Sequence, residues 1–189
     1  FVTGTYLANS TRYSFNSFSR HLVIGIVLSD SFAQQTSQSK LIRTVAGTGG
    51  KIHGGDGGLA TDASFGLPSS IAVASNGDIY FTDNVFHVIR KITQSTRIIT
   101  TIAGIPNKKG YSGDGGLATK ARLHEPNGIC FDESSGSIYF ADSQNHRIRT
   151  INSTGYISTV AGVGTRGFFG ENILATDAVL ASPLGLVRN

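Results

Sequence analysis

The chain has 189 residues, of which 24 are glycine and only 15% are charged. This balance is typical of many short strands joined by turns, and it excludes a mainly helical or disordered chain. The formal net charge of +4 is mild and spread along the sequence, which argues against the concentrated basic face of a nucleic-acid-binding protein.

A polar leader opens the chain and then gives way to an apolar run. Arg20-His21 precedes Leu22–Leu28, and Ser31-Phe32-Ala33 places small residues at the two positions that a signal peptidase reads. This pattern predicts a leader and signal peptide over residues 1–33, cut after Ala33, and therefore a secreted or extracellular protein. The run is too short to span a bilayer, so a membrane link would need another segment. A buried strand or a weak membrane anchor is the alternative interpretation of the run.

A repeat of 57 to 58 residues organises the rest of the sequence. Val45-Ala46-Gly47 returns as Ile102-Ala103-Gly104 and again as Val160-Ala161-Gly162, and Gly54–Thr61 returns almost unchanged as Ser112–Thr119. A fixed period of this size predicts one supersecondary unit per repeat, stacked so that each unit covers its neighbour.

Within a repeat, short apolar segments alternate with turn residues, which indicates strands rather than helices. The predicted strands are Ser70–Ala74, Ile79–Thr82, His87–Thr93 and Arg97–Ala103 in one copy, and Gly128–Asp132, Ile138–Ala141, His146–Asn152 and Tyr156–Ala161 in the next. Asn76-Gly77 is a strong hairpin signal between the first two. Several of these strands are apolar on both faces, so each small sheet must be covered on both sides. A four-stranded antiparallel sheet covered in this way is a propeller blade.

The segment between two blades is also predicted to contain structure. Leu117–Leu123 is expected to form one helical turn with Leu117, Ala121 and Leu123 packed inward.

The all-β fold class is therefore a β-propeller, with about two and a half blades in residues 34–189. The predicted parts are a ring-closing strand at 41–47, blades at 48–104 and 105–162, and the start of another blade at 163–189. Lys40–Ala46 matches the fourth strand of a repeat without its preceding strands. We expect its partners to lie beyond Asn189, as in propellers that close by a shared blade, so the chain is interpreted as an N-terminal fragment.

The segment Ile138–Arg149, followed by Val160-Ala161-Gly162, resembles the NHL repeat, named for an Asn-His-Leu triplet. Asn145-His146-Arg147 stands in the matching place, whereas the earlier copy reads Phe86-His87-Val88. The Gly-Asp-Gly-Gly-Leu-Ala-Thr insertion is similar to the long-blade NHL variety of teneurins and other secreted proteins. The resemblance implies a propeller of about six blades.

Asp83 and Asp142 end equivalent strands, and His87 and His146 follow each of them by four residues. Such residues converging from several blades could hold a divalent metal, calcium or zinc, near the propeller axis. The alternative, which we favour because the pair recurs in each copy, is structural. The carboxylate would accept hydrogen bonds from turn amides and from the histidine. Together with Asp56, Asp114 and Asn145, these residues define the repeat, and no cofactor is expected.

Other candidates have plainer explanations. Asp56 and Asp114 could be calcium ligands, but their spacing favours a tight turn. Arg90 and Arg149 are equivalent and could form a ring of cations that attracts an acidic partner, as in NHL propellers that bind RNA. Cys130 is expected in the core. The triplet Asn152-Ser153-Thr154 matches a glycosylation acceptor, although such triplets also occur by chance.

The sequence thus predicts a noncatalytic extracellular propeller that binds a protein or glycan through its loops, without nucleic acid. The alternatives are a metal-dependent propeller enzyme resembling lyases or lactonases, and the sensor part of a larger receptor or kinase. No activated serine or cysteine nucleophile is apparent.

Overall fold

The computed structural model of the chain describes residues 3–8, 11–16, 23–27 and 43–187. In the leader, β1 (Thr3–Ala8), β2 (Thr11–Asn16) and β3 (Val23–Val27) form an antiparallel sheet. β3 lies within the apolar run for which the sequence analysis predicts a signal peptide, and the signal peptide stays a prediction. The predicted cleavage site after Ala33 lies outside the described residues.

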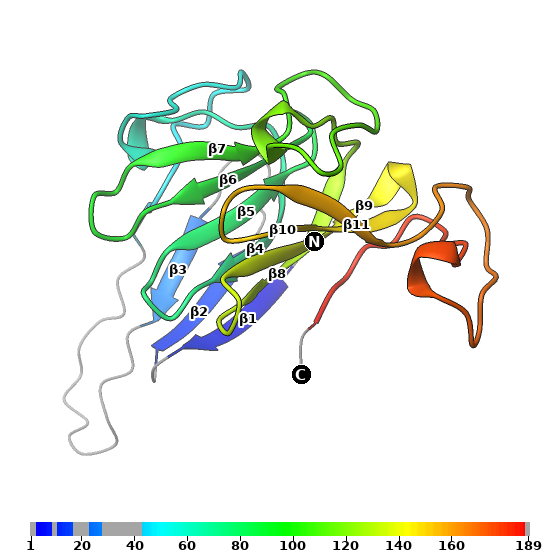
Figure 1. The fold of residues 1–189 in the computed structure, drawn as a ribbon. Coiled ribbons are helices and arrows are strands. Elements are labelled where there is room, and N and C mark those ends of the chain that lie inside the picture. Colours follow the sequence, from blue (N-terminus) through cyan, green and yellow to red (C-terminus); the bar gives the residue numbers. More distant parts are fainter. Residues whose placement is uncertain (1–2, 9–10, 17–22, 28–42, 188–189) are drawn as a thin grey trace, which may run out of the picture.

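The two complete repeats form four-stranded antiparallel sheets, as the sequence predicts (Figure 1). One sheet contains β4 (Pro68–Val73), β5 (Ile79–Asp83), β6 (Val88–Ile92) and β7 (Ile99–Ala103), in chain order. The other contains β8 (Pro126–Asp132), β9 (Ser137–Asp142), β10 (Arg147–Ile151) and β11 (Ile157–Ala161), again in chain order. The prediction of four-stranded antiparallel sheets is confirmed.

The first hairpin turns where the sequence places it. Gly77 adopts φ of 85°, and its amide donates to the Ala74 carbonyl over 2.8 Å, which closes a tight turn between β4 and β5. Glycine adopts this backbone conformation without the steric cost that a side chain imposes. The strand pairing then continues in register, with Ile79 opposite both Val73 and Ile92.

The two sheets pack against each other through apolar side chains. Tyr80 of β5 stacks on Phe131 of β8, with ring centroids 5.1 Å apart and planes 9° apart. Ser69 Oγ also donates to the Pro126 carbonyl over 3.2 Å. The buried cluster that joins the repeats comprises Ala72, Ala74, Tyr80, Ile89, Ala103, Ala118, Ala121, Leu123, Ile129, Ile138, Phe140, Ile151 and Ile157. Burial of each large apolar side chain contributes about 1.5–3 kcal/mol, so the stacking stabilises both sheets.

A second cluster covers the opposite face of the β4–β7 sheet. It comprises Val45, Ala46, Ala60, Ala63, Phe65, Val73, Ile79, Phe81, Ile92 and Ile99. The predicted ring-closing strand lies partly outside the described residues, and residues 43–47 are in no strand. Val45 and Ala46 are nevertheless buried, and the Gly47 amide donates to the Ala60 carbonyl over 2.9 Å. Both faces of this sheet are therefore covered.

Each inter-blade insertion contains a short 3-10 helix, namely η1 (Ala60–Asp62), η2 (Ala118–Lys120) and η4 (Ala175–Asp177). The single turn predicted over 117–123 is thus present but shorter. Ala121 and Leu123 are buried as expected, whereas the prediction for Leu117 is wrong, since this side chain is 47% exposed. The Leu117 backbone instead forms an isolated bridge with Tyr156, next to β11.

Candidate functional site

Two kinds of loop meet on one side of each sheet. The turn between the second and third strands comprises residues 84–87 in one repeat and 143–146 in the other, where η3 (Ser143–Asn145) lies. The segment that leaves the fourth strand begins at the same end, because Ala103 is paired with Ile89. The Asn107 amide donates to the Phe86 carbonyl over 3.2 Å, which ties the two loops together. We call this side the loop face.

The two predicted aspartates anchor the loop face from inside. The Asp83 carboxylate accepts hydrogen bonds from the amides of Gly66, Leu67 and Phe86, at 2.8, 3.2 and 3.4 Å. Asp142 accepts from the His124 amide over 2.8 Å. Both carboxylates are fully buried. Acceptance of turn amides by these carboxylates agrees with the structural interpretation.

Asn145 adds a contact that the first repeat lacks. Its Nδ2 donates to Asp142 Oδ2 and to the Gly110 carbonyl, both over 2.8 Å. Arg149 Nη1 donates to the same Asp142 oxygen over 3.2 Å. The Asn residue of the repeat signature therefore bridges a buried carboxylate to the loop that follows β7.

The two predicted histidines connect one repeat to the next rather than pairing with the aspartates. His87 Nδ1 accepts from the Glu125 amide over 3.2 Å, and His146 Nδ1 accepts from the Ser182 amide over 3.1 Å. Both histidines adopt left-handed φ values of 58° and 54° and end their turns, so they precede the strands in which the sequence analysis placed them. Burial, followed by the charge of His124, lowers the pKa of His87. Neutral His87 is therefore favoured.

The largest correction concerns the two arginines. Arg90 and Arg149 are fully buried, so they do not form an exposed ring of cations. Arg90 Nη2 donates to Asp56 Oδ1, and Arg149 Nη2 donates to Asp114 Oδ1, each over 2.6 Å. The same guanidinium groups also donate to carbonyls of the insertion, at Gly54 and Ser64 in one repeat and Ser112 and Arg122 in the other.

Each Gly-Asp-Gly-Gly turn is thus held against its own blade by a buried arginine. Asp114 also accepts from Thr159 of β11, through the amide at 3.1 Å and the hydroxyl at 2.6 Å. Burial raises the pKa of Asp114, but hydrogen bonds from Thr159, Arg149 and Tyr111 outweigh it and hold that pKa below the ordinary value. The structure gives Asp114 a function in anchoring the insertion to the third and fourth strands.

In the first repeat, burial and hydrogen bonds have the same opposing effects on the pKa of Asp56. Burial raises its pKa, while hydrogen bonds from Thr101 and Arg90 dominate together and lower it. The neighbouring His53 has a lowered pKa, because of burial first and then the Arg90 charge. For Asp142 burial prevails and raises the pKa despite its three donors.

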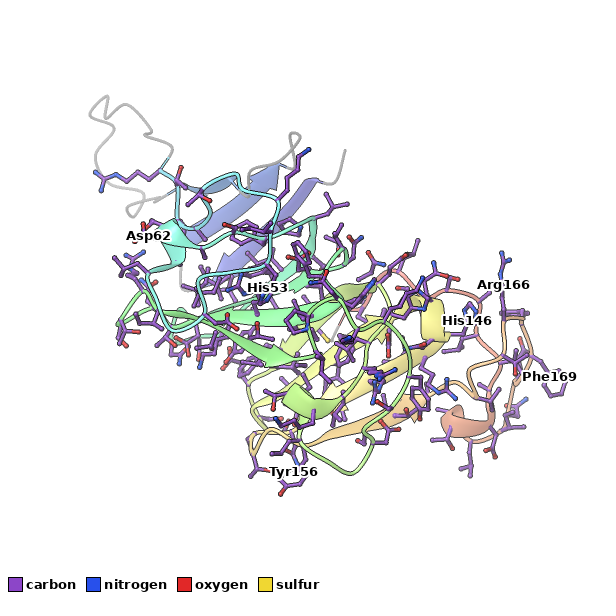
Figure 2. All side chains as sticks on the ribbon, turned by 90° about the horizontal axis from the view of Figure 1, so that it is seen from above. His53, Asp62, His146, Tyr156, Arg166 and Phe169 are labelled. Carbon is purple, nitrogen blue, oxygen red and sulfur yellow. The ribbon has the colours of Figure 1, made fainter. Side chains whose placement is uncertain are left out.

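Sequence reasoning missed a different set of cations that does lie at the surface. Lys51, Lys108 and Arg166 each lie four residues after the glycine of the repeated Val/Ile-Ala-Gly triplet, and all three are exposed. Large apolar side chains lie close by in sequence, with Ile52 74% and Phe168 93% exposed. Their fixed offset from the repeated glycine is the sequence signal that identifies them. Figure 2 shows Arg166 on the same side of the second blade as His146.

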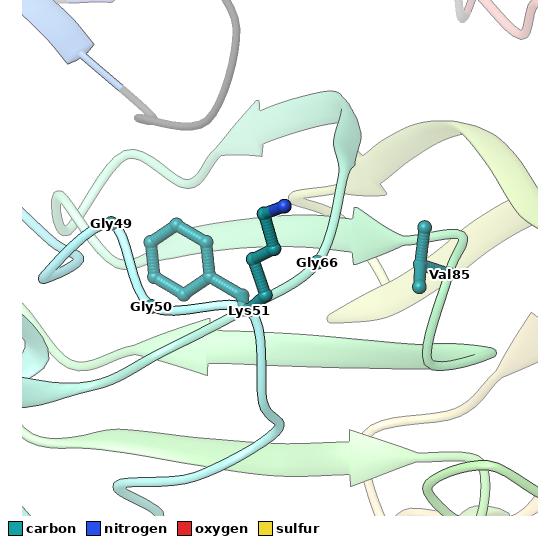
Figure 3. A pocket seen from close by; sticks show the side chains of 6 residues that line it. Gly49, Gly50, Lys51, Gly66 and Val85 are labelled. Atoms are coloured by element: carbon teal, nitrogen blue, oxygen red, sulfur yellow. The ribbon is translucent and has the colours of Figure 1, made fainter.

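A small pocket lies beside the first of these cations. It has a volume of about 260 Å³ and is lined by Gly49, Gly50, Lys51, Phe65, Gly66 and Val85 (Figure 3). Small-molecule sites usually enclose roughly 300–1,000 Å³. The pocket is therefore better suited to a protruding side chain than to a buried small-molecule ligand.

Among the described residues, no group of three or more His, Cys, Asp or Glu side chains is arranged to hold a metal ion. Asp83, His87, Asp142 and His146 have the structural contacts given above, and the metal-binding interpretation, which the sequence analysis did not favour, is not tested by these contacts. Cys130 lies in β8 and is half-buried. No helix in the described part of the chain has the length and hydropathy needed to cross a bilayer.

Comparisons with known proteins agree with the repeat pattern. The profile of the Teneurin NHL domain matches residues 103–181. Human Teneurin-1 is 34% identical over 137 residues, which cover 64% of this chain and 5% of that protein. Bovine NHL repeat-containing protein 2 is 32% identical over 73 residues, covering 39% of this chain and 10% of that protein. The chain thus spans a small part of the relatives that it matches.

Solved structures share the fold at lower identity. A protein of unknown function from Bacteroides thetaiotaomicron superimposes with a TM-score of 0.66 at 20% identity, over 97% of this chain and 41% of that one. An auxiliary nutrient binding protein from Bacteroides ovatus superimposes with a TM-score of 0.61 at 20% identity, over 95% and 40% of the two chains.

Proposed function

Because this chain belongs to the NHL-repeat family of β-propellers, we propose that it is a noncatalytic extracellular scaffold whose loop face binds another protein. Loops carried on a rigid framework are a common place for recognition, since the framework fixes their positions. The predicted signal peptide and the similarity to teneurins support the extracellular assignment. A partner protein with an acidic surface fits the charges of this face.

The observation that carries the proposal is the recurrence of an exposed cation at one loop position in three successive repeats. Lys51, Lys108 and Arg166 occupy this position, and the described residues provide no ion pair for any of them. The buried arginines have carboxylate partners, whereas these surface cations have no ion-pair partner among the described residues. They remain available for a partner.

The same loops combine charge with apolar surface. Ile52 and Phe168 are largely exposed next to these cations, and Lys109 extends the positive charge beside Lys108. Protein interfaces commonly combine apolar anchors with charged groups near the rim. Complementary charge mainly accelerates association and selects the partner, so loss of the cations should weaken binding through slower association.

Binding to intact eukaryotic cells would test this proposal. The full chain, tetramerised through a C-terminal tag, is expected to stain cells, and protease treatment of the cells should abolish staining. Lys108→Glu combined with Lys109→Glu should reduce staining about tenfold. Gln94→Glu, at the exposed turn between β6 and β7 on the opposite side of the sheet, should not.

Three outcomes would contradict the proposal. If glycosidases abolish staining and protease does not, the partner is a glycan rather than a protein. If the loop-face and control variants bind equally, the loop face is not the binding surface. For the competing enzyme hypothesis, stoichiometric zinc or calcium in the purified protein would overturn the noncatalytic assignment.

A further inference from the structure

The hairpin between β10 and β11 carries an acceptor triplet at its tip. Asn152, Ser153 and Thr154 follow β10 directly, and all three are exposed. The turn closes through the Gly155 amide, which donates to the Asn152 carbonyl over 2.9 Å. In Figure 2 the neighbouring Tyr156 lies on the opposite side of the blade from His146 and Arg166. A bulky group attached to this tip would therefore leave the loop face open.

The local conformation leaves one atom of the Asn152 side chain available. Its Oδ1 accepts from the Thr154 amide at 3.1 Å, the Thr154 hydroxyl at 2.7 Å and the Tyr156 amide at 2.9 Å. Within the described residues, Nδ2 donates no hydrogen bond, and Asn152 is exposed. The Thr154 hydroxyl is thus held against the amide whose nitrogen would be modified.

A glycan at this tip would also shield exposed apolar side chains on the adjoining surface. Tyr156 and Leu117 are each 47% exposed and form an isolated bridge next to the hairpin. An exposed apolar strip favours association with other chains, and a carbohydrate attached to a surface asparagine is bulky and solubilising. The position therefore combines an accessible acceptor with a surface that benefits from shielding.

The corresponding hairpin of the first repeat provides an internal contrast. It reads Thr93-Gln94-Ser95 in place of Asn152-Ser153-Thr154, so it lacks an acceptor asparagine. A second triplet, Asn9-Ser10-Thr11, belongs to the leader, and Asn9 and Ser10 lie outside the described residues. Asn152 is the acceptor that the repeat region provides.

We propose that Asn152 carries an N-linked glycan, an inference that rests on the extracellular route of the proposed function. The donor class is an oligosaccharide linked to a lipid through pyrophosphate. Asn152 Nδ2 forms a bond to the anomeric carbon, the bond from that carbon to the phosphate oxygen breaks, and the lipid pyrophosphate leaves with the electron pair. One amide proton is lost to a base.

Secretory expression of the full chain would test the modification. The Asn9→Gln variant is expressed in eukaryotic cells behind a strong surrogate leader, with an Asn-Gly-Thr triplet appended after Asn189 to report entry into the lumen. Peptide N-glycosidase in heavy-oxygen water should convert Asn152 to labelled aspartate in most molecules. Asn152→Gln and Thr154→Ala should each abolish that label, whereas Thr154→Ser should retain it. Thr93→Asn should introduce a label in the matched hairpin.

The result separates the two proposals. If the appended triplet is glycosylated and Asn152 is not, the inference about Asn152 is wrong, while the proposed extracellular function stands. If Asn152 is glycosylated behind the surrogate leader but neither site is modified behind the native residues 1–33, the acceptor assignment holds and the predicted export signal fails.

Discussion

The two complete repeats build the same sheet but balance their buried charges differently. In the second repeat, Arg149 pairs with both Asp114 and Asp142. In the first, Arg90 pairs with Asp56, and within the described residues its Nε has no hydrogen-bond partner, although it is buried. The second repeat therefore holds a more complete polar network around its arginine.

The residue at the signature position explains much of this difference. Asn145 donates to Asp142 in the second repeat, whereas Phe86 occupies this place in the first and contacts the His53 ring edge-on, with centroids 5.7 Å apart. One repeat thus joins its turn to the insertion with hydrogen bonds, and the other does so with an aromatic contact. The comparison indicates that the blade requires a link between the two loops but not one particular chemistry.

Removal of the buried arginine should have the largest effect and should differ between the repeats. Arg149→Met leaves the fully buried Asp142 carboxylate without its cation, and we expect it to lower the free energy of unfolding by about 4 kcal/mol. Arg90→Met leaves Asp56, which is 40% exposed and can be hydrated, so its cost should be smaller. Urea denaturation of both variants measures the difference, and equal losses would contradict the proposed network.

The signature position itself should show the next largest effect. Phe86→Ala removes a buried aromatic side chain and should cost about 3 kcal/mol, through lost burial and the cavity left behind. Asn145→Ala removes two hydrogen bonds and should cost about 1–2 kcal/mol. Thermal unfolding of the two variants ranks these losses. A larger loss for Asn145→Ala would mean that the polar link is the stronger one.

When the acidic partners are replaced instead of the arginines, the first repeat should lose more stability than the second. Asp56→Asn removes the carboxylate that pairs with Arg90, whereas Asp114→Asn leaves Arg149 paired with Asp142. We expect losses of about 2 and about 1 kcal/mol, reduced from those of a buried pair because both carboxylates are partly exposed. Unfolding at low and high salt is the measurement, and a greater loss for Asp114→Asn would refute the assignment.

The strand order could be predicted from sequence because the repeat appears twice and its strands are apolar on both faces. Ile79–Phe81 and Ile138–Phe140 have no polar side to expose, so stacked sheets are the arrangement that buries them. The Asn-Gly turn at residues 76–77 likewise depends only on local backbone preferences. These features need no knowledge of distant contacts.

The buried arginines could not be predicted in the same way. Arginine is almost never fully buried unless it is paired, so an arginine on a strand is expected to face solvent. The usable signal was its recurrence at separations of 34 and 35 residues from the aspartate of the insertion, with Asp56–Arg90 in one repeat and Asp114–Arg149 in the other. The fixed offset of Lys51, Lys108 and Arg166 from the repeated glycine was a second signal of this kind.

The smallest expected effect concerns acid and the contact between repeats. His87 Nδ1 accepts a backbone hydrogen bond from Glu125, and a protonated imidazole cannot accept it. The ring also meets His124 edge-on at 5.5 Å, and the charges of Lys109 and Glu125 act on it in opposite directions. Neutral His87 is therefore the form that stabilises this contact.

The sign of the pH dependence follows from the lowered pKa of folded His87. Between its unfolded pKa, near 6.5, and the lower folded value, the unfolded chain binds the proton more tightly. The contribution of His87 is thus present above pH 6.5 and is lost as the pH falls through that interval. His87→Gln should unfold with a smaller change in midpoint between pH 7.5 and pH 5 than the unaltered chain, as measured by urea denaturation. An unchanged pH dependence in this variant would place the acid sensitivity elsewhere, because a glutamine side chain keeps an acceptor oxygen that does not titrate.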